Sequence, residues 1–136
     1  MLPISDLDTL LRTLEPQLQH GTYVYVLSNE TPDFNDVRVV AAIRETEGLS
    51  LIVEESYARE KCLNAFFECA WITLTVSSDL AAVGLTAAFA TALGKSGISC
   101  NVVAGLNHDH IFVPVHQATL AMHELRALQQ SKNHSS

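Results

Sequence analysis

Clusters of basic side chains are absent from this sequence. Its Lys and Arg residues number 8, are scattered from Arg12 to Lys132, and are outnumbered by 15 Asp and Glu residues, which gives a formal net charge of −7. Binding to a phosphate backbone draws on the release of counterions by clustered cations, which this pattern does not supply. We therefore expect no direct contact with nucleic acid.

Long apolar runs and a basic, apolar leader are missing as well. The longest run without charge, from Leu80 to Gly94, is too short to span a bilayer comfortably. No basic patch followed by an apolar stretch stands at the N-terminus, so we expect no secretory signal. The sequence predicts no membrane partner and, by default, a cytoplasmic location.

Signatures of catalysis are missing too. The three cysteines, Cys62, Cys69 and Cys100, are far apart and lack metal-ligand spacing, which favours reduced thiols that serve packing. Gly94 and Gly97 fit the end of a helix rather than a phosphate-binding loop. No nucleophile with a base and no paired-carboxylate site is apparent, so we expect no enzymatic activity and no cofactor.

Apolar periodicity organises the first half of the chain. Leucines at helical spacing predict a helix that begins at Ser5 and frays between Pro16 and Gly21. Strands are predicted over 23–27, 37–44 and 49–53, with a turn at Gly48, followed by a short helix over 54–63. In the second of these strands, one face is expected to carry Val37, Val39, Ala41 and Ile43.

The second half reads as strand, helix, strand, strand, helix. Strands are predicted over 69–76, 98–104 and 110–113, with Ile98, Cys100, Val102 and Ala104 pointing inward. Asp79 is a suitable N-cap for a helix over 80–93, and a last helix follows Pro114. This order is one strand short of the ferredoxin-like βαββαβ plan. Because the tail 131–136 is too polar to supply a strand, the first half must contribute it, which makes an α+β fold of two lobes sharing strands.

The helix over 80–93 is apolar on more than one face. Both faces of such a helix must be buried. One face is expected to pack on its own sheet and the other against a second lobe or a second subunit, which predicts a homodimer. Gly84 is expected one turn inside this helix, where glycine is unfavourable relative to alanine and therefore indicates a close approach by a ligand or another backbone.

Two segments of the second half, AVGLTAAFATAL and GISCNVVAGLNHDHIFVP, resemble the ACT domain, and VAAIRETEGLSLIVEE in the first half is similar to another ACT lobe. The chain looks most like the small stand-alone bacterial ACT proteins and is similar to the ACT pairs of aspartate kinases and cytosolic arginine sensors. The resemblance implies an N-terminal lobe over 1–66, a C-terminal ACT domain over 67–130 and a polar tail over 131–136.

A further implication of the resemblance is a regulatory function. Modules of this type bind amino acids or related small molecules between paired lobes, without catalysis. The pocket uses the loop after the first strand, the start of the next helix and the following strand, with an acidic position before the third strand. The corresponding residues here are Ser77, Ser78, Asp79, Leu80, Val83, Gly84, Asn101, Val102, Val103 and Asp109.

Two other interpretations stay open at this stage. The glycine common in such ligand-binding loops is replaced here, since Asp79 is followed by Leu80. This favours, as the alternative, a structural or protein-interaction module with a degenerate pocket. The third interpretation is a metal or catalytic site at His108 and His110, beside Asp109. No further ligand falls at a suitable interval, so turn and strand-end histidines, and no metal, are expected.

Overall fold

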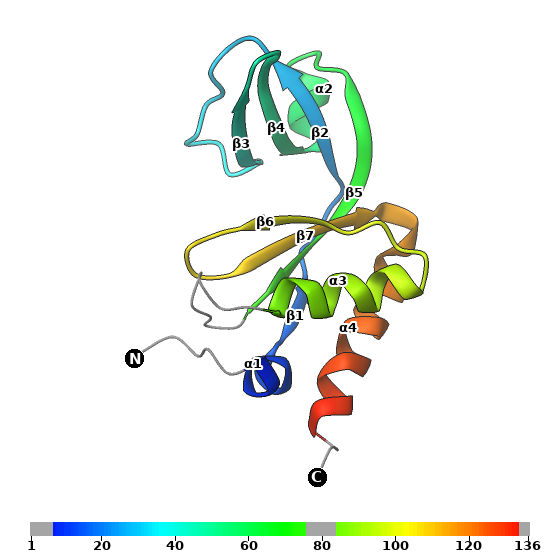
Figure 1. The fold of residues 1–136 in the computed structure, drawn as a ribbon. Coiled ribbons are helices and arrows are strands. Elements are labelled where there is room, and N and C mark those ends of the chain that lie inside the picture. Colours follow the sequence, from blue (N-terminus) through cyan, green and yellow to red (C-terminus); the bar gives the residue numbers. More distant parts are fainter. Residues whose placement is uncertain (1–6, 76–83, 134–136) are drawn as a thin grey trace. The chain divides into compact units, whose positions relative to one another are not determined.

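A computed structural model describes residues 7–75 and 84–133 (Figure 1). The chain forms two compact units, of which unit 1 comprises residues 1–19 and 71–136 and unit 2 comprises residues 20–70. The predicted ranges 1–66 and 67–130 run consecutively along the sequence, whereas the N-terminal segment is here part of the same unit as the C-terminal half.

Unit 2 is an antiparallel sheet with one short helix. Its elements in chain order are β2 (Tyr23–Ser28), β3 (Val39–Glu45), β4 (Gly48–Glu54), α2 (Glu55–Glu60) and the first part of β5 (Ala65–Leu74). The strand order is β3-β4-β2-β5. The strands and the small helix predicted from periodicity are therefore confirmed, although α2 ends earlier than expected.

Between β2 and β3 the ferredoxin-like plan would place a helix, but unit 2 has none there. Residues 29–38 connect the two strands through turns and irregular backbone. The core is consequently formed by the sheet and α2 alone, and its buried members are Val24, Val26, Leu51, Val53, Tyr57 and Ala58.

The predicted alternation of the strand over 37–44 is wrong. Val37 is 92% exposed, and Ile43 is 50% exposed. The register passes from Val39 opposite Val53 to Ala41 opposite Ile52, so Val40 is an extra residue in the ladder. Such a bulge reverses which side chains point inward. The core of unit 2 is accordingly contacted by Val39 and Ala42.

Unit 1 contains the remaining elements. They are α1 (Leu7–Thr13), β1 (Pro16–Leu18), the second part of β5, α3 (Leu85–Lys95), β6 (Asn101–Ala104), β7 (Asp109–Pro114), a short 3₁₀ turn (Val115–Gln117) and α4 (Ala118–Asn133). Strand β5 is followed in the sheet by β7 and then β6, and β1 pairs with β5. Helix α4 packs against α1, α3 and β1.

The strand missing from the second half comes from the first half, as expected, but from a segment predicted to be helical. Helix α1 ends at Thr13, and β1 pairs antiparallel with β5 from Pro16 opposite Leu74 to Leu18 opposite Ile72. A proline inside a helix removes a backbone hydrogen bond and clashes with the preceding turn. An edge strand accommodates it.

Alternate residues along β1 and its flanks form backbone hydrogen bonds with β5. Gln19 N donates to Trp71 O at 2.8 Å, and Thr75 N donates to Glu15 O at 3.0 Å. Because hydrogen-bonded pairs alternate in an antiparallel ladder, the backbone groups of Pro16 and Leu18 point away from β5.

Gly84 lies at a helix start rather than inside a helix. It is the N-cap of α3 with φ of +99°, and the predicted helical residues 80–83 lie outside the described part of the chain. A Cβ atom on Gly84 would stand 3.1 Å from Leu7 Cδ2. Gly84 is therefore closely approached, but by a side chain of α1 and not by another backbone.

We expect Gly84→Ala to lower the free energy of unfolding by about 1–2 kcal/mol, because the left-handed backbone disfavours any Cβ atom. Gly94→Ala is the matched control, since Gly94 lies in α3 with nothing within 4 Å of the added atom. That substitution is expected to stabilise by about 0.5–1 kcal/mol. Urea unfolding of both variants checks the pair, and equal effects would contradict this role of Gly84.

The two faces of α3 differ. Leu85, Phe89 and Leu93 are buried, whereas Thr86 and Ala87 on the other face are exposed. The prediction that Ala104 points inward is wrong, because Ala104 ends β6 beside the turn and is exposed.

Candidate functional site

The residues expected to bind a ligand fall into two groups. Ser77, Ser78, Asp79, Leu80 and Val83 lie outside the described residues. The other five residues stand at the start of α3 and on the hairpin of β6 and β7, and they are Gly84, Asn101, Val102, Val103 and Asp109.

The hairpin distributes its four predicted residues over both faces of the sheet. Asn101 is opposite Phe112 and Val103 is opposite His110, while Val102 is opposite Ile111. Successive side chains of a strand point to opposite faces. Val102 and Asp109 therefore share one face of the hairpin, and Asn101 and Val103 share the other.

Asp109 is a largely buried acidic residue. It is 9% exposed, and among the described residues its carboxylate makes no hydrogen bond or ion pair and keeps some contact with solvent. Burial raises the pKa of the Asp109 carboxyl, an effect partly opposed by the neighbouring His110. Removing an ionised carboxylate from water is unfavourable unless a cationic or hydrogen-donating partner is supplied. Such a group is suited to hold an ammonium or guanidinium.

His110 belongs to a chain of hydrogen bonds within unit 1. Trp71 Nε1 donates to His110 Nδ1 at 3.1 Å, and Thr73 Oγ1 lies 3.3 Å from the same nitrogen. Gln19 Nε2 donates to Thr73 Oγ1 at 3.0 Å. Since Trp71 is only a donor, His110 Nδ1 accepts, and these contacts assign the proton of the neutral ring to Nε2. Burial lowers the pKa of His110, in agreement with the neutral form.

The His110 ring is held in place by contacts within unit 1. It lies over the turn, where a Cβ atom on Gly105 would stand 3.3 Å from His110 Nε2. Among the described residues, no group of three or more His, Cys, Asp or Glu side chains is placed to hold a metal ion.

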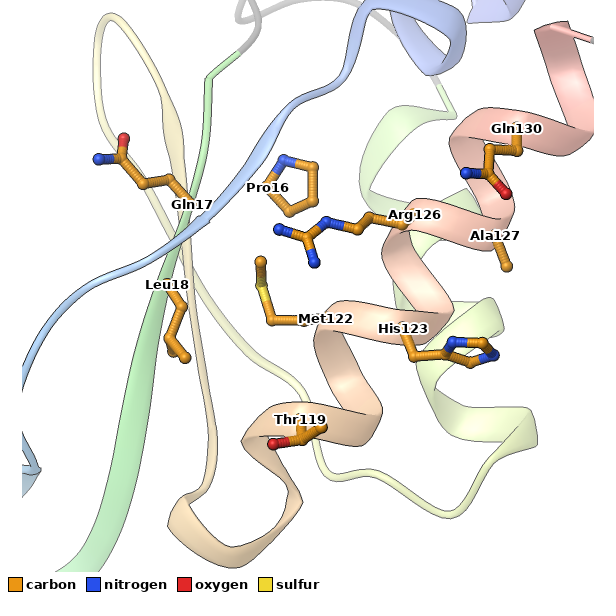
Figure 2. Close-up of a pocket in the computed structure, with 9 residues that line it drawn as sticks. All are labelled: Pro16, Gln17, Leu18, Thr119, Met122, His123, Arg126, Ala127 and Gln130. Atoms are coloured by element: carbon orange, nitrogen blue, oxygen red, sulfur yellow. The ribbon is translucent and has the colours of Figure 1, made fainter.

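A groove between β1 and α4 was not anticipated from the sequence. It encloses about 790 Å³, and Figure 2 shows Arg126 and Met122 extending from α4 toward β1. The β1–α4 groove is lined by Pro16, Gln17, Leu18, Thr119, Met122, His123, Arg126, Ala127 and Gln130. The available signal was the i, i+4 spacing of Met122 and Arg126 on one face of a helix.

A second cavity lies within unit 2. It encloses about 500 Å³ between the segment 27–33 and α2, with Tyr57 and Lys61 on the helix side. Its lining mixes both signs of charge, since it includes Glu30 and Asp33 as well as Lys61. This cavity forms where the connection between β2 and β3 lacks a helix.

Two family models described as ACT domain match the sequence, one over residues 3–70 and the other over residues 67–127. The chain belongs to the ACT domain family. ACT domains are typical of regulatory modules that bind ligands. None of the curated proteins compared with the sequence matches it.

Several solved structures share this ACT fold. A Vibrio cholerae protein of unknown function, described as a possible transport protein, is 42% identical with a TM-score of 0.81 over 91% of this chain and 96% of its own. The ligand-free regulatory subunit of aspartate kinase from Thermus thermophilus is 10% identical with a TM-score of 0.63 over 85% of this chain and 96% of its own. The latter likeness shows the fold alone.

The antiparallel sheet and helices of this ACT fold agree with the predicted α+β, ferredoxin-like fold class. Within the described ranges, none of the helices combines the length and the apolar character needed to cross a bilayer.

Proposed function

We propose that this ACT protein is a non-catalytic regulatory module that binds a small amino acid at an interface between ACT lobes. The observation that carries the proposal is the largely buried Asp109, whose carboxylate makes no hydrogen bond or ion pair among the described residues. A ligand ammonium or guanidinium placed against it would offset the cost of its burial.

The carboxylate end of the ligand requires hydrogen-bond donors and positive charge. The first backbone amides of a helix are not bonded within the helix and carry partial positive charge, which suits a carboxylate. In this chain α3 begins after Gly84. Ser77, Ser78, Asp79, Leu80 and Val83 belong to the proposal as the segment before it, together with Asn101, Val102 and Val103 of the hairpin. We propose further that a homodimer completes the interface, since α3 leaves one face of small side chains exposed.

The second candidate is a structural or protein-interaction module with a degenerate pocket. It is favoured by the division of the hairpin residues, because Asn101 and Val103 lie on the face opposite Asp109. A site using only one of these faces would involve fewer of the predicted residues.

Asp109→Asn separates the two candidates. Because burial raises the pKa of Asp109, the folded state favours the protonated carboxyl, and stability is lost as the pH rises from the ordinary pKa of an aspartate through the pKa of the folded state. A neutral amide avoids this loss, so the ligand-free variant should be more stable than the wild type at pH 7. The difference should shrink at pH 4.

The same variant should lose its response to ligand. In a thermal-shift panel of the common amino acids, at least one should stabilise the wild type and leave Asp109→Asn unchanged. Glu47→Gln, on an exposed turn, is the control and should behave as the wild type. A panel with no stabilising amino acid would favour the interaction module.

A further inference from the structure

We propose that the β1–α4 groove is a second ligand site, which binds an aliphatic carboxylate of medium chain length. The site lies within unit 1, and its lining shares no residue with the site predicted around Asp109. The proposal stands independently of amino-acid binding.

The walls of the groove are suited to an alkyl chain. Pro16 and Leu18 line it from β1, and Met122 and Ala127 line it from α4. Leu18 is 43% exposed, although it is a large apolar residue, so its side chain remains available for contact. Each methylene group removed from water adds to the binding free energy, which favours an occupant with several of them.

The charge of the lining selects the head group. Arg126 is the residue of the groove with a permanent charge, and no Asp or Glu lines it. Within the described part of the chain Arg126 makes no ion pair or hydrogen bond, and Figure 2 shows its guanidinium directed from α4 into the space beside Pro16. Guanidinium groups bind carboxylates through paired hydrogen bonds. The acidic chain thus presents a local cation beside an apolar surface.

The size of the groove is compatible with a small-molecule ligand. Its volume of about 790 Å³ falls in the range of small-molecule sites in proteins. Gln17, Thr119 and Gln130 add polar groups at its boundary, where the solvent-exposed part of a head group would lie. A lining that combines apolar side chains with polar ones, including one permanently charged cation, suits an amphipathic anion.

Isothermal titration of the full chain with octanoate tests this proposal. We expect octanoate to bind, octanol to bind more weakly, and acetate not to bind, because both the chain and the charge are required. Arg126→Gln should weaken octanoate binding about tenfold and leave octanol unchanged. Leu18→Thr should weaken both ligands.

Two control variants define the specificity. Arg44→Gln removes the same charge from an exposed position in unit 2 and should leave octanoate binding unchanged. Asp109→Asn should also bind octanoate normally, which separates this result from the test of the amino-acid site. Absence of octanoate binding, or equal effects of Arg126→Gln and Arg44→Gln, would overturn the proposal. Sedimentation showing a dimer that Leu18→Thr dissociates would assign the groove to a second copy of the chain instead.

Discussion

Phe89→Ala is expected to lower the free energy of unfolding by about 3–5 kcal/mol, the range seen when a fully buried aromatic side chain is truncated. Phe89 has no exposed surface and stands between Leu85 and Leu93 on the buried face of α3. This helix packs against both α1 and α4, so the neighbours are held from several sides. A cavity at such a position collapses only in part, which adds to the lost transfer free energy.

Urea unfolding followed by circular dichroism measures this loss. Because domains of this size are stable by about 5–15 kcal/mol, the variant should unfold at a clearly lower urea concentration. Thr86→Ala is the matched control, since it lies on the exposed side of the same helix. Its effect should stay within about 0.5 kcal/mol. A loss below about 1 kcal/mol for Phe89→Ala would contradict the packing described for α3.

Leu51→Ala is the corresponding change in unit 2, with an expected loss of about 2–5 kcal/mol. Leu51 lies in β4 and is buried in the cluster that includes Val26, Val53 and Tyr57. Since α2 is the helix that covers this cluster and 29–38 supplies no second one, few other groups are available to fill the space.

Hydrogen exchange shows which strands lose stability in Leu51→Ala. Amides of β2 and β4 should exchange faster in Leu51→Ala, because Leu51 belongs to this pair of hydrogen-bonded strands. Ile43→Ala provides the comparison, since Ile43 is half exposed on the neighbouring strand and should cost less than about 1 kcal/mol. If both variants had the same stability, the assignment of Leu51 to the core would be wrong.

Much of the fold follows from local patterns. Strands β2, β4 and β7, with the helices α2, α3 and α4, appear where apolar spacing and turn residues predict them. The need for a strand from the first half also follows from the sequence, because the polar tail cannot provide one.

Local patterns fail where long-range pairing decides the structure. The leucines from Leu7 to Leu18 keep helical spacing, yet Pro16 and Leu18 pair with residues far along the chain. The bulge at Val40 has no distinct local signature, and it reverses the faces of β3.

The candidate sites are still harder to derive from the sequence. The acidic position of Asp109 could be identified by resemblance, but its shielding depends on how the hairpin packs. The β1–α4 groove combines residues from opposite ends of the chain, and β1 itself was predicted as helix. No periodicity within either segment indicates that they meet.

The outward-facing backbone of β1 has a consequence for how this protein behaves at high concentration. A strand added to this edge would need amide donors from alternate residues, and Pro16 has no N–H to offer. Leu18 is left as the one donor of this three-residue strand that points outward. Extension of the sheet by another chain along β1 is thereby discouraged, which works against edge-to-edge association at this strand.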